Sequence, residues 1–253
     1  MIRQITDASV LNSDREILLK SYYGRKLLAY LEAYGTQYDF CRFYELVYEN
    51  TRAYMFQINS AALVCAYEEF PPDELITYIG MYRPFRVEIP QFMLDKINVV
   101  EGYGKLKRTQ FQLNDVPPDN FAEDEILENP KLDHVFEILH EGFPTIDHYG
   151  LWMTENSHRV RRGSSKIYLY RNCTTATVIF DVDNYVLIGQ VATKMEHRGK
   201  NYARELLHWL GAKLAKEGKT AVLFALDYRE SYYREIGFKE IGIESVLQQI
   251  EQD

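Results

Sequence analysis

Apolar residues near the start of the chain change from the spacing of helices to the spacing of strands. A helical period runs over 14–34, with a break near Gly24. Its apolar members are Ile17, Leu18, Tyr22, Leu27, Leu28 and Leu31. Three strands are then predicted, at 43–48, 53–58 and 61–67. Because Glu49-Asn50 and Asn59-Ser60 between them are turn-forming pairs, we expect these strands to be antiparallel.

The rest of the chain repeats this order of elements. The first half continues with a helix, a strand, a helix and a strand, at 71–82, 85–89, 90–97 and 110–113. The second half is predicted to have helices at 132–139, 147–161, 202–217 and 230–236, and strands at 166–170, 175–180, 185–192 and 221–226. The helix at 202–217 has the clearest pattern, since Leu206, Leu210 and Leu214 share one stripe and Gly218 stands at the C′ position.

Two domains are expected from this repeated order. No sequence repeat accompanies it, so one continuous α+β domain with an N-terminal extension stays open as the alternative. Between the halves, Pro117-Pro118 precedes an acidic stretch with few large apolar residues, which is typical of a linker. The expected division is therefore a domain at 1–115, a linker at 116–129 and a domain at 130–253.

The composition is that of a globular protein with no overall attraction for nucleic acid. The chain has 253 residues, 46% of them hydrophobic, and 29 Lys and Arg against 37 Asp and Glu give a net charge of −8. Cys41, Cys65 and Cys173 lie far apart without metal-ligand spacing, so neither a disulfide framework nor a metal site is expected. Since no apolar run approaches the roughly 18 residues of a membrane span, we expect a cytoplasmic protein that binds no membrane.

The turn before the helix at 202–217 carries the candidate chemistry. It reads Glu196-His197-Arg198-Gly199-Lys200-Asn201 and follows the strand that ends near Thr193. A helix N-terminus has unpartnered backbone N–H groups and the positive end of the helix dipole, so it attracts anions such as phosphate. Arg198 and Lys200 add charge that can neutralise a pyrophosphate. An ordinary strand-to-helix turn with a solvated basic tip is the alternative.

The wider context of this turn resembles the GNAT N-acetyltransferase superfamily. In that family a strand is followed by Q/R-x-x-G-x-G/A at a helix start, and residues 196–201 here read E-H-R-G-K-N. The family's second motif, Y-x-x-x-G-F, is matched by Y-R-E-I-G-F at 233–238. The resemblance covers about residues 130–242. It implies a GNAT-like α/β fold with a mixed sheet, and transfer of acetyl from acetyl-CoA to a primary amine by direct attack in a ternary complex.

The resemblance also implies roles for individual residues. Tyr233 would protonate the departing CoA thiolate, with Tyr232 as its nearest competitor and aromatic packing as the alternative. The backbone of Val191 and Thr193 would pair with the pantetheine arm, and an N–H near Val191 would polarise the acetyl carbonyl. The residues expected to bind acetyl-CoA are Val191, Ala192, Thr193, Arg198, Gly199, Lys200, Asn201, Tyr202 and Ala203.

Three positions qualify these roles. Gly189 is expected to mark a bulge where the strand at 185–192 leaves its neighbour, with tight packing as the alternative. Asn201 replaces the family's small residue; Asn tolerates left-handed backbone angles, but its side chain could crowd a phosphate. Glu196 brings a negative charge to the anion site unless it points away. No general base is assigned, and the candidates by proximity in sequence are Asp181, Asp183, Asp227 and His197.

The N-terminal half has no counterpart of the phosphate turn. Its strand at 61–67 is followed by acidic residues, Glu68 and Glu69 first, which would repel a pyrophosphate. We expect a degenerate GNAT-like copy that has lost CoA binding and that shapes the acceptor pocket or supports a homodimer. The acidic composition suits a cationic acceptor amine, such as a small molecule or a peptide. The alternative function is a non-catalytic CoA-sensing or protein-binding module.

Overall fold

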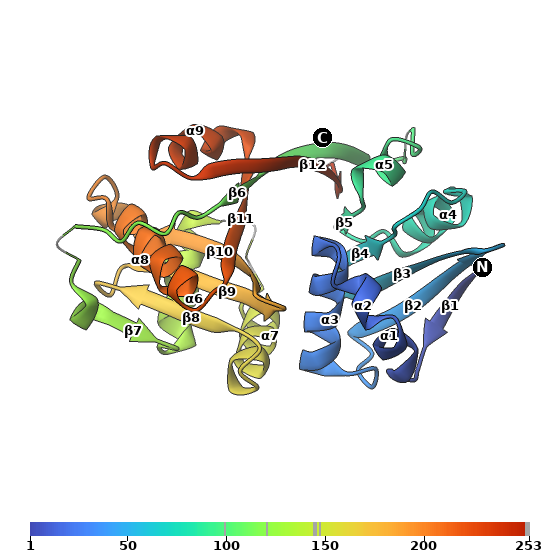
Figure 1. The fold of residues 1–253 in the computed structure, drawn as a ribbon, viewed down its shortest axis with the longest axis horizontal. Coiled ribbons are helices and arrows are strands. Elements are labelled where there is room, and N and C mark those ends of the chain that lie inside the picture. The colour runs from blue at the N-terminus through green and yellow to red at the C-terminus, as the bar shows by residue number, and fades with distance from the viewer. Residues whose placement is uncertain (99, 120, 144–145, 147, 251–253) are drawn as a thin grey trace. The chain divides into compact units, whose positions relative to one another are not determined.

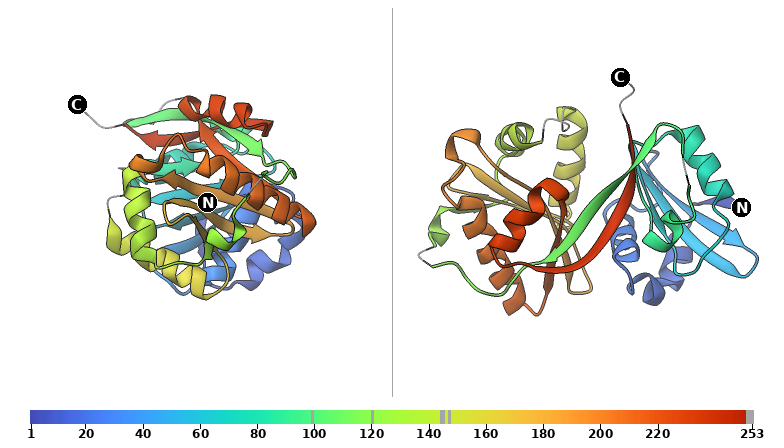
Figure 2. Two further views of the ribbon diagram at one scale, coloured as in Figure 1. Left: turned by 90° about the vertical axis from the view of Figure 1, so that its left-hand side faces the viewer. Right: turned by 90° about the horizontal axis from the view of Figure 1, so that it is seen from above.

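The computed structural model describes residues 1–98, 100–119, 121–143, 146 and 148–250. They form two compact units, and each is described by itself (Figures 1 and 2). Unit 1 combines Met1–Thr109 with Gly242–Asp253, and unit 2 is Gln110–Ile241. Strand β6 (Tyr103–Gln112) therefore begins in unit 1 and ends in unit 2, and strand β12 (Lys239–Gln249) begins in unit 2 and ends in unit 1.

Unit 1 is built on a mixed sheet whose strands are hydrogen-bonded in the order β1, β2, β3, β4, β5, β12 and β6. Its further strands are β1 Ile2–Ile5, β2 Cys41–Tyr48, β3 Thr51–Ile58, β4 Ala61–Cys65 and β5 Arg86–Glu88. The strands β1 to β4 pair antiparallel, and β5 pairs parallel with β4. This pairing confirms the three predicted antiparallel strands. Glu49 and Asn59 lie in the turns between them, with φ angles of 46° and 47°.

The helices of unit 1 differ from the prediction at the N-terminus. The helical stretch expected over 14–34, with a break near Gly24, is two helices, α2 Arg15–Leu18 and α3 Tyr22–Tyr34, and the break lies just before Gly24, at residues 19–21. A further helix, α1 Ser9–Ser13, precedes them. Helix α3 begins after Ser21, whose Oγ accepts a hydrogen bond from the Gly24 amide at 3.0 Å. A Cβ on Gly24 would come within 2.0 Å of the Leu18 carbonyl oxygen, so this glycine lets α2 approach α3. The predicted later helices are confirmed as α4 Asp73–Tyr82 and α5 Gln91–Leu94.

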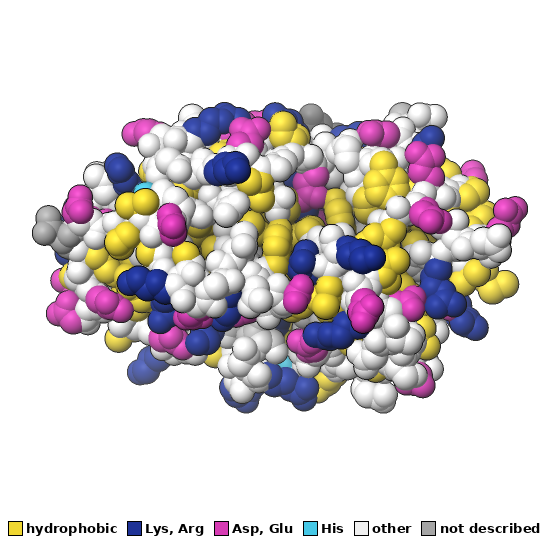
Figure 3. Space-filling model, viewed as in Figure 1, with side chains coloured by type: hydrophobic (Ala, Val, Ile, Leu, Met, Phe, Trp, Pro, Cys, Tyr) yellow, Lys and Arg dark blue, Asp and Glu magenta, His cyan; other side chains and the backbone are white. Residues whose placement is uncertain are grey.

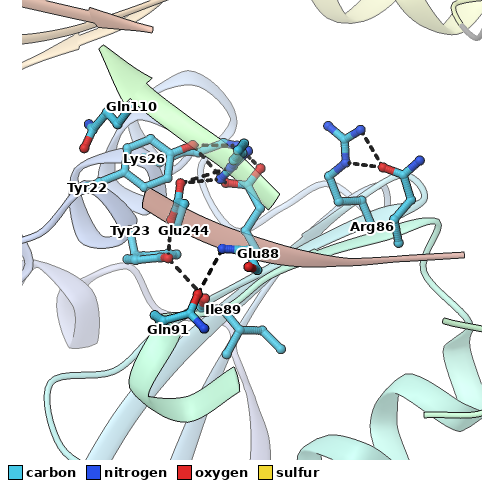
Figure 4. Close-up of polar contacts among 12 residues, drawn as sticks. Tyr22, Tyr23, Lys26, Arg86, Glu88, Ile89, Gln91, Gln110 and Glu244 are labelled. Atoms are coloured by element: carbon cyan, nitrogen blue, oxygen red, sulfur yellow. Dashed lines mark hydrogen bonds and ion pairs between the residues drawn. The ribbon is translucent and has the colours of Figure 1, made fainter. Parts of the chain in front are cut away.

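Unit 1 also buries a cluster of charged side chains from four elements (Figure 4). Glu88 of β5 accepts hydrogen bonds from Lys26 Nζ of α3 at 2.6 Å and from Arg108 Nη2 of β6 at 2.8 Å. Arg108 Nε donates to Glu244 of β12 at 3.0 Å. The exposed fractions of the Lys26, Glu88 and Glu244 side chains are 15%, 9% and 12%, so these charges depend on one another for solvation. The cluster attaches the C-terminal strand to the N-terminal segments of the unit.

Unit 2 contains the remaining strands of the same hydrogen-bonded sheet, in the order β6, β11, β10, β9, β8 and β7. Its further strands are β7 Ile126–Glu128, β8 Lys166–Tyr170, β9 Thr174–Val182, β10 Tyr185–Thr193 and β11 Thr220–Leu226. Its helices are α6 Leu132–Gly142, α7 Tyr149–Arg161, α8 Tyr202–Lys216 and α9 Asp227–Glu235, with 3-10 turns η1 Glu123–Glu125 and η2 Met195–His197. All predicted helices and strands of this half are confirmed, although Asp147, the expected start of α7, lies outside the described residues.

Helices cover both faces of this sheet. The leucine stripe of α8 packs against Val186 and Ile188, whereas Val135 and Ile138 of α6 pack against Ile167 and its neighbours. Because side chains alternate along a strand, Ile167 lies on the opposite face from Tyr168, which belongs to the core under α8. The predicted stripe and the C′ glycine are confirmed, with Gly218 at a φ of 73°.

The expected division at 1–115, 116–129 and 130–253 needs three changes, and the first is that residues 110–115 belong to unit 2. The expected linker contains η1 and β7; β7 pairs with β8, and Phe121 stacks on Tyr170 at a centroid distance of 4.8 Å, so this segment belongs to unit 2. The final part of β12 belongs to unit 1, because Val246 pairs with Glu88.

On the face drawn in Figure 3, acidic and basic side chains are interspersed on both units.

Candidate functional site

Strands β10 and β11 diverge in the middle of unit 2. Their parallel pairing covers Tyr185–Ile188 and Thr220–Leu223, although β10 continues to Thr193 and β11 to Leu226. The register between β10 and β9 shifts after Gly189, and Gln190 has a φ of 52°. A Cβ on Gly189 would also lie 3.1 Å from the Ile179 side chain. The predicted bulge is confirmed, together with the tight packing that was its alternative.

The turn after β10 brings the chain to the N-terminus of α8. Gly199 has a φ of 77°, which favours glycine, and Asn201 has a φ of 63° as the residue before the helix. Asn201 thus adopts the left-handed conformation that its sequence position requires. No side chain caps this end of α8, so the backbone N–H groups of its first turn are available to a ligand.

Arg198 ties this turn to the preceding strand and to α6. Its Nε donates to the Thr193 carbonyl oxygen and its Nη2 to the Glu141 carbonyl oxygen, both at 3.2 Å. The Glu141 carboxylate in turn accepts a hydrogen bond from the Met195 amide at 2.8 Å. A Cβ on Gly142 would come within 3.0 Å of the Ala192 Cβ, so the glycine lets the end of α6 pack closely on β10. Two of the donors of Arg198 are therefore already used by backbone carbonyls.

The other charges of the turn are arranged differently. Glu196 is 77% exposed, its carboxylate lies 3.2 Å from His197 Nε2, and it does not line the cleft described below. Lys200 Nζ lies 3.4 Å from His197 Nδ1, and no carboxylate among the described residues pairs with it. The negative charge that could have opposed anion binding thus points away, and the ammonium of Lys200 remains.

Tyr233 stands at the far side of the site, on α9. Its side chain is 5% exposed, and its ring stacks on Phe238 with the centroids 6.2 Å apart. Burial raises the pKa of Tyr233, and the positive charge of Arg229 opposes this shift. Burial also raises the pKa of the neighbouring Tyr232, to about 12. Both phenols are therefore protonated at neutral pH and can donate a hydrogen bond.

These features line one cleft of about 420 Å³. Every residue that the sequence nominated for cofactor binding or catalysis contributes to its lining: Val191, Ala192, Thr193, Arg198, Gly199, Lys200, Asn201, Tyr202, Ala203 and Tyr233. Tyr232 and His197 also line it. The structure therefore brings together residues from the end of β10, the turn, α8 and α9.

Sequence reasoning missed Glu141, Gly142, Tyr228 and Arg229 of the lining. Arg229 lies over the Phe143 ring, with its guanidinium carbon 4.9 Å from the centroid, and so brings a further cation beside Tyr233. Glu141 and Gly142 carry no local signal, because they reach the cleft only when α6 packs on β10. Arg229 could have been nominated from its place four residues before Tyr233 on one helix.

Three of the four candidate bases do not line the cleft. Asp181 is paired with Lys219 at 2.7 Å, Asp183 lies in the turn between β9 and β10, and Asp227 begins α9. His197 lines the cleft, and Glu141 is a carboxylate in the lining that the sequence did not suggest. The general base stays unassigned.

The described residues contain neither a cluster of metal ligands nor a membrane-spanning helix. No group of three or more His, Cys, Asp and Glu side chains there is arranged to hold a metal ion. In the same residues, every helix is too short or too polar to cross a membrane.

Neither a protein-family model nor a curated protein sequence matches the chain. Solved structures do. A Drosophila protein matches with a TM-score of 0.66 and 11% identity, over 98% of each chain. A tandem GNAT protein from the clavulanic acid biosynthesis pathway matches with a TM-score of 0.61 and 11% identity, over 100% of this chain and 99% of that one. A GNAT-family acetyltransferase from Colwellia psychrerythraea matches with a TM-score of 0.58 and 14% identity, over 99% and 100%. The chain has the GNAT fold.

The GNAT fold confirms the α/β architecture that the two motifs implied. At identities of 11% to 14% this likeness concerns the fold alone. The strand–turn–helix segment at 191–203 comprises the end of β10, the turn and the start of α8. The second motif, at 233–238, begins in the last turn of α9 and ends just before β12.

Proposed function

We propose that this chain is an acetyl-CoA-dependent N-acetyltransferase that moves an acetyl group to a primary amine by direct attack in a ternary complex. The observation that carries the proposal is one cleft lined by the end of β10, beyond its pairing with β11, by the uncapped N-terminus of α8 and by the buried Tyr233. The N-terminus of α8 can bind an anion, the end of β10 can pair with an extended arm, and Tyr233 can protonate a leaving group.

The donors at the turn suit the pyrophosphate of acetyl-CoA. The first turn of α8 offers backbone N–H groups and a positive dipole end, and Lys200 adds an ammonium. Around Gly199, no described atom lies within 4 Å of the place that a Cβ would take, which leaves its backbone open to a phosphate. We assign the pyrophosphate to the turn and first helical residues, namely Gly199, Lys200, Asn201, Tyr202 and Ala203.

The end of β10 suits the pantetheine arm. Beyond the last pair, Ile188 with Leu223, the strand edge that faces β11 has no ladder partner there, so Val191, Ala192 and Thr193 can pair through their backbone with the amides of the arm. We assign Arg198 to hold this edge and the turn in place, because its guanidinium binds the carbonyls of Thr193 and Glu141. This refines the role expected for Arg198 from sequence, which was to neutralise the pyrophosphate.

The chemistry requires one attack and two proton movements. A neutral amine nitrogen attacks the acetyl carbonyl carbon, the new C–N bond forms and the C–S bond breaks. An N–H near Val191 stabilises the developing oxyanion. The Tyr233 hydroxyl gives its proton to the departing thiolate, and the surplus proton of the amine leaves to water or to an adjacent base. Because burial raises its pKa, Tyr233 keeps its proton until the thiolate forms.

We infer that unit 1 is a second GNAT-like copy without a CoA site. Its β4 and β5 repeat the parallel pairing of β10 and β11, from Ala61 with Arg86 to Leu63 with Glu88. Asp73 and Glu74 occupy the first turn of α4, and their carboxylates disfavour a phosphate at this helix start. Titration of CoA followed by nuclear magnetic resonance should shift signals of unit 2 first; a site filled in unit 1 would overturn this inference.

The function is tested by two measurements on the full chain. Acetyl-CoA and CoA should each raise the melting temperature, and CoA thiol should be released when a panel of primary amines is added to the acetyl-CoA mixture. The panel should include cationic amines, which the acidic composition favours, and amines bearing a carboxylate. Stabilisation without release on any amine would favour a CoA-sensing module instead. No stabilisation by either ligand would refute the CoA assignment.

A further inference from the structure

Three cations surround the turn between β8 and β9, next to the proposed CoA cleft. Arg171 and Asn172 make this turn with φ angles of 51° and 53°. The Lys194 amide donates to the Cys173 carbonyl oxygen at 2.9 Å, which places Lys194 alongside the turn. Thr174 and Thr193, one on each strand, approach to 3.0 Å through their hydroxyl oxygens. The turn is thus fixed against the strand end that leads into the cleft.

Arg171 reaches the wall of the cleft from this turn. Its Nη1 donates to the Tyr202 hydroxyl at 3.4 Å, and its guanidinium carbon lies 4.9 Å from the Tyr202 ring centroid. Tyr202 lines the cleft, and so does Lys200. The thiol of Cys173 is influenced by all three cations: burial raises its pKa, and the charges of Lys200, Arg171 and Lys194 oppose that shift. These side chains therefore share one small region.

Within the part of the chain that the structure describes, two of the three cations in this region have no carboxylate partner. Arg171 pairs with Glu125 at 3.1 Å and is one-third exposed, at 33%. Neither Lys194 nor Lys200 has a carboxylate within ion-pair distance among the described residues. The pyrophosphate already has the N–H groups of α8 and Lys200 as partners. The Nε and Nη1 atoms of Arg171 contact Glu125, Tyr170 and Tyr202, so its Nη2 donor and the ammonium of Lys194 are available to a second anionic group of the same ligand.

We propose that Arg171 and Lys194 bind the 3′-phosphate on the ribose of CoA, as a subsite separate from the pyrophosphate turn. The proposal rests on the proposed function. A phosphate monoester carries a charge of about −1.5 to −2 at neutral pH and has three acceptor oxygens. A guanidinium recognises such a group through paired N–H donors, and an ammonium adds a point charge. The chain therefore distinguishes CoA from 3′-dephospho-CoA.

Isothermal titration calorimetry with CoA and with 3′-dephospho-CoA tests the subsite. We expect the parent chain to bind CoA about tenfold or more tightly than 3′-dephospho-CoA, the effect of one or more charge-assisted hydrogen bonds. Lys194→Met and Arg171→Met should each weaken CoA binding and leave 3′-dephospho-CoA binding unchanged. The discrimination should also shrink with rising salt. Lys213→Met, on α8 over the Trp209 ring and outside the cleft, is the matched control and should keep the parent ratio.

The outcomes separate the subsite from the function on which it rests. Equal affinity of the parent for the two ligands would overturn the subsite and leave the CoA assignment standing. Equal weakening of both ligands by Lys194→Met would also overturn it. If neither ligand binds the parent, the proposed function fails, and the subsite fails with it. Because Arg171 also pairs with Glu125, Lys194→Met decides the question if Arg171→Met does not fold.

Discussion

Arg198 donates a hydrogen bond from Nε to the carbonyl oxygen of Thr193 at 3.2 Å, and so ties the turn before α8 back to the strand that precedes it. The neighbouring Lys200 has no such tie, since its ammonium lies only near His197, at 3.4 Å from Nδ1. Two cations that look equivalent in the sequence thus have different surroundings. One shapes the site, and the other is free to meet a ligand.

Replacing these two cations should have separable effects. Arg198→Met should lower the melting temperature by about 2 to 4 °C, because it releases two backbone carbonyls from their donors. Lys200→Met should leave the melting temperature unchanged and weaken CoA about tenfold, with a shallower dependence on salt. Thermal unfolding and calorimetry measure the two effects. If Arg198→Met keeps its stability and binds CoA as weakly as Lys200→Met, Arg198 is a direct ligand and the assignment is wrong.

Tyr233→Phe should lower kcat about 100-fold and leave CoA affinity unchanged, because it removes the proton donor for the thiolate but keeps the ring that stacks on Phe238. Steady-state thiol release and CoA titration provide the two readouts. Tyr232→Phe is the matched control: it removes a neighbouring phenol in the same cleft and should retain most of the turnover. If turnover falls in Tyr232→Phe and is retained in Tyr233→Phe, Tyr232 is the proton donor and Tyr233 is not.

Asn201 should tolerate glycine and reject valine. Its φ of 63° is accessible to Gly and Asn, whereas a β-branched residue is strained there. Asn201→Gly should keep the free energy of unfolding within about 0.5 kcal/mol of the parent, and Asn201→Val should lower it by about 1 to 2 kcal/mol. Urea denaturation of the two variants checks this. Equal stability would mean that the turn relaxes to another conformation.

Glu88→Gln should destabilise the chain by about 3 kcal/mol or more, because it leaves the buried charge of Lys26 without a carboxylate partner and removes one carboxylate partner of Arg108. Glu69→Gln is the control: Glu69 pairs with Lys96 at 3.0 Å, but its side chain is 59% exposed, and the expected loss is below about 1 kcal/mol. The free energy of unfolding in urea at pH 7 gives both values. Similar losses would show that the buried cluster contributes little.

The same carboxylate predicts a direction for the effect of acid. Burial by itself would raise the pKa of Glu88, but the charges of Arg108 and Lys26 hold it well below its usual range. A pKa that is lower in the folded state stabilises the protein above the unfolded-state value of 4.5, and this contribution is lost as the pH falls below that value. Unfolding measured from pH 7 to pH 3 should therefore show a steeper loss of stability in the parent than in Glu88→Gln. Parallel curves would contradict the shift.

Local patterns along the chain were sufficient for much of unit 2. The leucines of α8 repeat at helical spacing because one face of the helix must be buried, so the helix could be predicted without knowing what covers it. The turn at 196–201 and the tyrosine at 233 were nominated by their resemblance to two short GNAT motifs, each of which lies within one segment. For the same reason, every residue nominated for the cleft lines it.

Tertiary structure decided what no single segment specifies. Strand β12 follows α9 in the sequence, but Glu244 binds Arg108, 136 residues earlier, and so the strand ends in unit 1. Arg198 meets Glu141 across 57 residues, and this contact shows that the arginine holds backbone carbonyls. A periodic pattern encodes burial, which is a property of one segment. A hydrogen bond between distant residues depends on how both segments pack. The sequence of one segment does not indicate which residue of the other it will contact.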